Sequence, residues 1–268
     1  MYLATLKGQP ASILGLAGHQ GMDASCVALA FESGVNYFFF YDLSHKSMLS
    51  GLKPLVATQR EQVFIATGSD DRDLDRWRQY LEQVRRYLDV DVVDVFFAEY
   101  VTPSEDIAQI WSVLDELWDW KKRGLIRYVG ATTHNRAIAL ELIKSDRIEI
   151  LMYRYNMAHR KAEECVFPMA QQVGIPVVAF TCTRWGQLLQ GHPEWQREIP
   201  TAADCYRYAL HQKAVHLALT APKTRAQLEQ NLSVLHSAEL TPELVAQWQD
   251  YGALVYGNGQ DAFETQWP

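Results

Sequence analysis

Residues 124–135 read GLIRYVGATTHN, and they span the end of one predicted helix, a strand and the approach to another helix. The basic run KKR at 121–123 precedes Gly124. Cations followed by glycine are typical of a helix C-terminus, where the helix dipole is negative. Residues 126–131 are mostly apolar and predict a strand, and residues 136–144 predict the next helix. The segment therefore predicts one helix–strand–helix unit with short connections.

The same alternation continues in both directions along the chain. Apolar runs rich in β-branched and aromatic residues predict eight strands, and amphipathic stretches after them predict helices. This pattern favours a closed parallel (β/α)₈ barrel, the TIM-barrel class of α/β fold, over a doubly wound open sheet. The predicted strands are 13–16, 35–40, 63–67, 92–97, 126–131, 149–154, 175–180 and 215–220; the predicted helices are 22–33, 74–88, 107–122, 136–144, 163–172, 202–212 and 225–235.

Length and composition are consistent with one barrel domain over residues 1–268. The chain has 268 residues, of which 48% are hydrophobic, enough for a large core. No Pro- or Ser-rich linker divides it. Residues 239–268 are expected to form a C-terminal tail, carrying Trp248 and Trp267, that packs on the barrel.

Charge and cysteine usage narrow the class of partner and the compartment. The net charge of −7 argues against nucleic acid, although a local basic cluster can still attract a small anion. No apolar run reaches the ~20 residues that cross a bilayer, and no signal-peptide pattern follows Met1. The cysteines have no CxxC spacing and predict reduced thiols, so we expect a cytoplasmic protein. We expect its substrate to be a small molecule, and the sequence leaves a protein partner open.

Three segments resemble the aldo-keto reductases and fall in that family's order. GVNYF at 34–38 resembles its second strand. GLIRYVGATTHN at 124–135 is similar to its GKIRxIGVSNxN segment, and PKTRAQLEQN at 222–231 is similar to its xKTxxQLxxN segment. The resemblance implies a barrel that binds NADP(H) across its C-terminal mouth.

The resemblance also implies which residues contact NADP(H). Lys223 and Thr224, at a helix start, would hold the 2′-phosphate, and such a site suits an anion on physical grounds as well. The alternative is a solvated helix start with ordinary capping by Thr224. Phe180 stands where the family has an aromatic residue that stacks on nicotinamide, or else only fills the core. The other implied contacts are Thr132 and Thr133 at the nicotinamide amide, and Gln227 and Asn231 at the adenine.

The family's four catalytic positions carry different residues in this chain. The family uses Tyr as a proton donor, Lys and Asp to tune it, and His to orient the carbonyl. The matches place Phe39 at the Asp position, Gly68 at the Lys position and Glu99 at the His position, while the Tyr position falls on Ser44 or His45. Phe39 and Gly68 cannot exchange a proton, so ordinary carbonyl reduction should be slow.

Substitute catalytic groups are nevertheless present. A branch of the family has Glu in the His position and reduces carbon–carbon double bonds, which makes Glu99 a candidate, with Tyr41 or His45 as a substitute acid. The alternatives are an ion pair of Glu99 with Arg154 or Arg184, and a solvated polar loop around Tyr41 and His45.

Three functional classes follow from these residues. The first is an NADP(H)-binding oxidoreductase with non-standard or lost carbonyl-reducing chemistry, and the second is a non-enzymatic cofactor-binding or protein-interaction module on the same barrel. A metal-dependent hydrolase is disfavoured, because no HxH or HExxH motif occurs. The segment YRYNMAHR at 153–160 could form either an anion-binding rim or a structural network.

Overall fold

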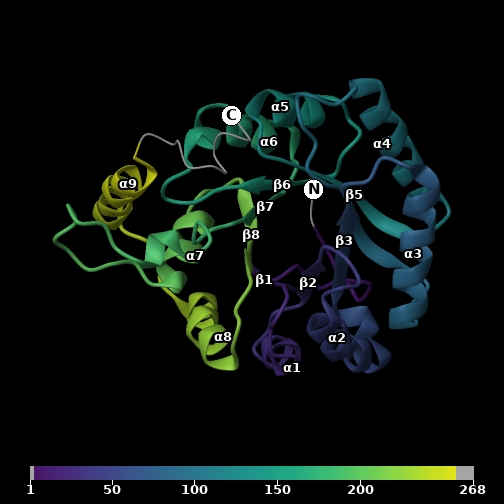
Figure 1. Ribbon diagram of the computed structural model, residues 1–268, viewed down its shortest axis with the longest axis horizontal. Helices are drawn as coiled ribbons and strands as arrows, with labels where there is room; N and C mark the ends of the chain where they lie inside the picture. The colour runs from purple at the N-terminus through teal and green to yellow at the C-terminus, as the bar shows by residue number, and fades with distance from the viewer. Residues whose placement is uncertain (1–2, 258–268) are drawn as a thin grey trace.

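The computed structural model describes residues 3–257 and contains a closed barrel of eight parallel strands. Each strand pairs with the next, and β1 pairs with β8, so the sheet has no open edge (Figure 1). The (β/α)₈ prediction is therefore confirmed, and the open-sheet alternative is excluded. The strands are β1 Leu14–Ala17, β2 Tyr37–Phe40, β3 Phe64–Ser69, β4 Val93–Ala98, β5 Ile126–Thr133, β6 Ile150–Arg154, β7 Val177–Phe180 and β8 Val215–Thr220.

Helices surround the barrel and begin at capping side chains. Asp73, Asp106 and Asn135 each accept a hydrogen bond from a backbone N–H in the first turn of the helix that follows. Such caps explain why α3, α4 and α5 begin where the sequence predicts. The α-helices are α1 Ser25–Glu32, α2 Lys46–Gln59, α3 Leu74–Leu88, α4 Ile107–Lys122, α5 Arg136–Lys144, α6 Val166–Val173, α7 Ala202–Leu210, α8 Arg225–Leu232 and α9 Pro242–Tyr256; the short 3₁₀ helices are η1 Arg60–Gln62, η2 Lys161–Glu164, η3 Gln187–Leu189 and η4 Ser233–His236.

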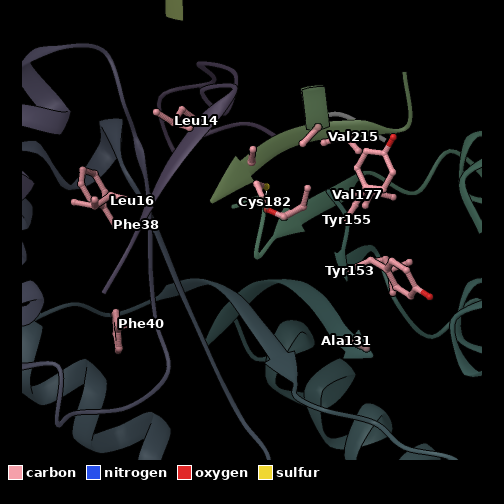
Figure 2. Close-up of a cluster of buried hydrophobic side chains, with 14 of the residues drawn as sticks. Leu14, Leu16, Phe38, Phe40, Ala131, Tyr153, Tyr155, Val177, Cys182 and Val215 are labelled. Atoms are coloured by element: carbon pink, nitrogen blue, oxygen red, sulfur yellow. Dashed lines mark hydrogen bonds between the residues drawn. The ribbon is translucent and has the colours of Figure 1, made fainter. Parts of the chain in front are cut away.

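Strand residues alternate between two buried layers. In β2, Tyr37 and Phe39 point into the barrel with the inward residues of the other strands. Phe38 and Phe40 point outward and pack under the helices, as Figure 2 shows for part of this outer layer. The alternation follows from the period of two along a strand. Phe39, which the resemblance matches to the family's Asp position, therefore lies inside the barrel.

Helix α2 is absent from the sequence prediction, which passes directly from the second strand to the third. Gly51 and Pro54 lie within this helix, and both residue types have low helix propensity, so they interrupt the helical pattern of the sequence. In the structure Gly51 lies against α1, where a Cβ would come within 2.7 Å of the Ala24 carbonyl oxygen. Close packing of α1 on α2 thus uses the glycine that weakens the sequence signal.

The N-terminal end of the barrel is closed by the start of the chain. Leu3 belongs to the inner apolar layer, and the backbone of Ala4 pairs with that of Pro10. The buried Asp94 carboxylate forms ion pairs with Arg60 at 2.9 Å and with Arg127 at 2.7 Å. Leu3 and the Ala4–Pro10 bridge thus cover the end of the barrel that lies opposite the mouth where the strands end.

Helix α9 packs over the loops that follow β6 and β7. The Tyr251 hydroxyl donates to the Leu188 carbonyl at 2.8 Å, and Trp248 is buried. The predicted packing of Trp267 falls outside the described residues. Cys26, Cys182 and Cys205 are buried free thiols, and Cys165 is half-buried. Within residues 3–257 no helix has the length and apolar character to cross a membrane.

Candidate active site

A cavity of about 420 Å³ opens where β2, β3 and β4 end. Glu99 directly follows β4, and Tyr41 and His45 follow β2, so parallel strands bring all three predicted catalytic side chains to one place. Ser44, the alternative at the family's Tyr position, is exposed and does not line the cavity. The remaining lining residues are Asp42, Gly68, Ser69, Asp70, Tyr80 and Tyr100.

Glu99 is a buried carboxyl group without an ion pair among the described residues. It is 3% exposed, and its Oε1 atom is buried with no hydrogen-bond partner. The Arg72 guanidinium donates to the Glu99 backbone carbonyl at 2.7 Å rather than to the carboxyl group. The expected alternative, a pair with Arg154 or Arg184, is therefore wrong.

Burial of the Glu99 carboxyl group favours its neutral form. Burial raises its pKa well above the ordinary value, the nearby Asp70 carboxylate adds to the rise, and Arg72 offsets part of it. A neutral carboxylic acid can donate a hydrogen bond, which a carboxylate cannot. In its neutral form Glu99 is thus a potential hydrogen-bond donor that lines the cavity.

Gly68 makes room for Glu99. A Cβ on Gly68 would lie 2.5 Å from Glu99 Oε1 and 2.5 Å from the Phe97 carbonyl oxygen. At position 68, which the resemblance matches to the family's Lys, the Glu99 carboxyl group therefore occupies the space that a side chain would need. Phe39 packs edge-on against Tyr41 and Phe97, with ring centroids 4.9 and 6.0 Å apart. Gly68 and Phe39, which the resemblance matches to two catalytic positions of the family, thus both lie against Phe97.

Tyr41 forms a pair with Tyr100, a residue that the sequence analysis did not identify. Their rings are stacked at 14° with centroids 6.2 Å apart. Burial raises the pKa of Tyr41, and the neighbouring Tyr100 hydroxyl, to which it is hydrogen-bonded, raises it further. Burial also raises the pKa of Tyr100, although the bond to Tyr41 opposes the rise. Both phenols therefore stay protonated at neutral pH.

The backbone of Tyr100 is strained, with a φ of 52° in the left-handed region. Its N–H donates to Thr132 Oγ1 at 2.7 Å, and its ring stacks on that of His134 with centroids 5.8 Å apart. Such strain is concentrated at functional sites. The only feature of the sequence that could have identified Tyr100 is its position, directly after Glu99 at the end of a predicted strand.

His45 lies at the N-terminus of α2 and is 9% exposed. Its Nδ1 atom is buried without a hydrogen-bond partner, and a Cβ on Gly18 would lie 3.1 Å from it. Burial lowers the pKa of His45, while the Asp42 carboxylate opposes the change. The burial of His45 thus differs from the predicted alternative of a solvated polar loop, although Asp42 and Ser44 of the same loop are exposed.

The residues predicted to hold the nicotinamide lie at the ends of β5 and β7. Thr132 accepts the bond from Tyr100, so its hydroxyl hydrogen can still be donated. The Thr133 hydroxyl donates to the Val101 carbonyl at 2.7 Å, and the residue is fully buried. Phe180 packs edge-on against His134 with centroids 5.2 Å apart. The structure thus leaves Thr132 and Phe180 at the mouth and uses Thr133 internally.

The residues predicted to hold the adenosine phosphate lie at the start of α8. Thr224 is the N-cap, and its hydroxyl oxygen accepts from Gln227 N, which confirms the predicted capping. Gln227 Oε1 accepts a hydrogen bond from the Lys223 backbone N–H at 2.8 Å. The Lys223 side chain is exposed. Asn231 is 6% exposed and donates to Thr220 Oγ1 at 2.9 Å. Its contact with adenine stays a prediction, as do those of the other residues.

The sequence is similar to known oxidoreductases. The model of the Aldo/keto reductase family matches residues 24–198. The chain is 22% identical over 265 residues to the uncharacterized oxidoreductase YqkF of Bacillus subtilis, covering 83% of this chain and 85% of that protein. It is 26% identical over 176 residues to probable aldo-keto reductase 1 of Glycine max, covering 59% of this chain and 48% of that protein.

Solved structures share the fold over nearly the whole chain. The holo form of aldo-keto reductase AKR11C1 from Bacillus halodurans superposes with a TM-score of 0.77 at 20% identity, covering 97% of this chain and 99% of the other. An aldo/keto reductase from Klebsiella pneumoniae in complex with NADP and acetate has a TM-score of 0.76 at 14% identity, covering 94% and 95%.

Proposed function

The chain belongs to the aldo/keto reductase family, and from this premise we propose that it is an NADP(H)-dependent reductase whose acid is the neutral carboxyl group of Glu99. The observation that carries the proposal is this carboxyl group, which is buried over Gly68 and lines a cavity at the catalytic mouth. The proposed substrate is a neutral, carbonyl-conjugated alkene rather than a simple aldehyde.

The residues present fit NADP(H) at one end of the mouth. The exposed Lys223 ammonium and Arg225 flank the N-terminus of α8, where free N–H groups and the helix dipole favour a phosphate. The loop after β1 holds this segment, because Asp23 N donates to the Lys223 carbonyl at 3.1 Å. Lys223 and Thr224 would therefore hold the 2′-phosphate, with Gln227 beside the adenosine.

At the nicotinamide end, the protein offers one aromatic ring for stacking and one hydroxyl group for the amide. Phe180 would stack on the ring, and the Thr132 hydroxyl would bind the amide group. When bound, NADPH supplies a hydride to an electron-poor carbon. The position of Glu99 after β4, one strand from Thr132, supports a reaction centre at this side of the mouth.

The role of Glu99 follows from its protonation. As charge develops on the carbonyl oxygen of the substrate, a hydrogen bond from the neutral carboxyl group stabilises it, and such a donor typically contributes ~10²–10³ in rate. The Tyr41–Tyr100 pair would orient the substrate and hold further protons. Phe39 and Gly68 offer no group that lowers the pKa of a phenol, so transfer of a proton to the alkoxide of a simple aldehyde is poorly supported.

Calorimetry with NADPH and NADH tests the cofactor part of the proposal. A charged hydrogen bond contributes roughly 1.5–3 kcal/mol, so Lys223→Ala should weaken NADPH binding by at least ~10-fold and leave NADH binding nearly unchanged. Lys213→Ala is the matched control, because it removes an exposed lysine from the opposite end of the barrel. Equal affinities for NADPH and NADH in the wild type would contradict the phosphate role. Binding of NADPH without oxidation by any substrate would favour the non-enzymatic module.

A further inference from the structure

The reaction cavity at the ends of β2, β3 and β4 is lined by acidic side chains. Its wall contains the exposed carboxylates of Asp42 and Asp70 as well as the buried Glu99. Among residues 3–257, no lysine or arginine lines it. Burial lowers the pKa of His45, which also lines the cavity, so this imidazole favours its neutral form. The cavity wall therefore carries negative charge that no cation within the wall offsets.

The guanidinium of Arg72 lies beside this cavity but is used elsewhere in the protein. It pairs with Glu105 at 2.7 Å and donates to the Glu99 backbone carbonyl at 2.7 Å. Its side chain is only 10% exposed. Arg72 therefore holds the chain at the end of β4 and does not line the space that a ligand would occupy.

The two exposed carboxylates differ in how they are held. Asp42 Oδ1 accepts a hydrogen bond from the Ser44 backbone N–H at 2.6 Å, which ties this carboxylate to its own turn. The Asp70 side chain forms no hydrogen bond or ion pair with another residue in the part of the chain that the structure describes. Asp70 is therefore the carboxylate that stays open to a molecule in the cavity.

The pairing of β3 with β4 places Asp70 beside Glu99. Ser69 pairs with Ala98 in the register of the two strands, and Asp70 and Glu99 are the residues that follow. The Glu99 backbone N–H donates to the Ser69 carbonyl at 2.9 Å, which continues the pairing past the strand ends. Burial and then the Asp70 carboxylate raise the pKa of Glu99, as expected of neighbouring acidic groups. A molecule that contacts the Glu99 carboxyl group thus comes close to Asp70.

Two buried polar atoms of the cavity indicate where a ligand binds. Glu99 Oε1 and His45 Nδ1 have no hydrogen-bond partner among the described residues, and the two residues are 3% and 9% exposed. A buried polar atom without a partner costs free energy, and a ligand that supplies the partner recovers it. A polar group of the ligand is therefore expected at Glu99, with the rest of the ligand near Asp70.

We infer that Asp70 is a specificity-determining residue, which admits uncharged substrates to the reaction cavity and rejects those that carry a carboxylate near the reacting carbonyl. The inference rests on the proposed function, because it narrows the substrate class of the same site. Two like charges ~4 Å apart repel each other enough, even in water, to weaken binding about 5-fold. The effect grows where the cavity excludes water.

Two ligands that differ only in charge test this role: a cyclohexenone that carries a carboxylate, and the same cyclohexenone with a carboxamide in its place. Calorimetry on the full chain at neutral pH measures both dissociation constants. Wild type should bind the carboxamide more tightly, and Asp70→Asn should lower this preference about 5-fold. Asp70→Glu keeps the charge and should keep the preference. Asp91→Asn is the matched control, because it removes an exposed carboxylate from the opposite end of the barrel, before β4 begins.

The preference between the two ligands separates charge selection from any effect of Asp70 on Glu99, because both ligands share the enone. Added salt should narrow the wild-type preference, since it screens exposed charges. Equal affinities of wild type for the two ligands, binding of neither, or a preference that Asp70→Asn does not change would overturn the inference. Reduction of the carboxamide by NADPH is measured separately, and its absence contradicts the proposed function while the binding data still decide the role of Asp70. Thermal unfolding of each variant confirms that it is folded.

Discussion

Replacing Glu99 by glutamine should change how the stability of the protein depends on pH. Burial raises the pKa of Glu99 above its ordinary value of 4.5, so the folded protein keeps a proton that the unfolded chain releases above about pH 4.5. Unfolding then releases this proton, and its contribution to the free energy of unfolding falls as pH rises until Glu99 itself ionises. Glutamine has nearly the same shape and cannot ionise, which removes this contribution.

The magnitude follows from proton linkage. Each pH unit inside the window changes the free energy of unfolding by about 1.4 kcal/mol for one proton. Because about 1 kcal/mol shifts the Tm of a domain near this size by roughly 2–4 °C, the Tm of Glu99→Gln should rise relative to wild type by about 3–6 °C per pH unit. The variant should therefore gain most at the alkaline end of the window.

Thermal unfolding of both proteins between about pH 5 and about pH 7 measures this difference. Glu82→Gln makes the same chemical change at a carboxylate whose side chain is 45% exposed, and its curve should run parallel to the wild type. A Tm difference between Glu99→Gln and wild type that stays constant over this range would show that Glu99 is ionised in the folded protein. That result would refute the proposed role of Glu99 as an acid.

Two further predictions concern packing and specificity. Gly252→Ala places a Cβ 2.0 Å from the Met157 carbonyl oxygen and should lower the free energy of unfolding by about 3 kcal/mol. The control Gly34→Ala has a φ of 96° but open space around its Cβ, so it should lower the free energy of unfolding by only about 1–2 kcal/mol. Chemical denaturation measures both losses, and equal losses would contradict the close approach of α9 to Met157. With nitrobenzaldehyde, NADPH oxidation should stay far below the ~10 per second typical of enzymes, because Phe39 and Gly68, which the resemblance matches to the family's Asp and Lys, cannot tune a proton donor. The absorbance of NADPH reports the rate of oxidation. A turnover near the typical value would show that another acid does the work of the family's Tyr.

Much of the fold was predictable because the local signals agree with the global architecture. Helices α3, α4 and α5 begin at Asp or Asn caps, and their predicted boundaries match the structure. Helix α2 was missed because Gly51, which lets α1 approach, is a poor helix former. Helix α6 begins at Val166, later than predicted, since the 3₁₀ helix η2 precedes it.

The site was predictable in position but not in its contacts. Strand ends at one mouth bring Tyr41, His45 and Glu99 to one cavity, as a parallel barrel requires. The fit of the Glu99 carboxyl group over Gly68 depends on the register of β3 and β4, which composition does not reveal. Tyr100 was missed because its role depends on a left-handed backbone that turns its ring toward Tyr41.

The rate of NADPH consumption with a cyclic enone, at saturating cofactor, tests the central claim most directly. Wild type should reduce the alkene, and identification of the saturated ketone confirms the reaction. Glu99→Gln should lose ~10²-fold or more in this rate because it removes the acidic proton, while Glu82→Gln should retain the rate. Equal rates for wild type and Glu99→Gln, or no reduction by a wild type that binds NADPH, would contradict the account.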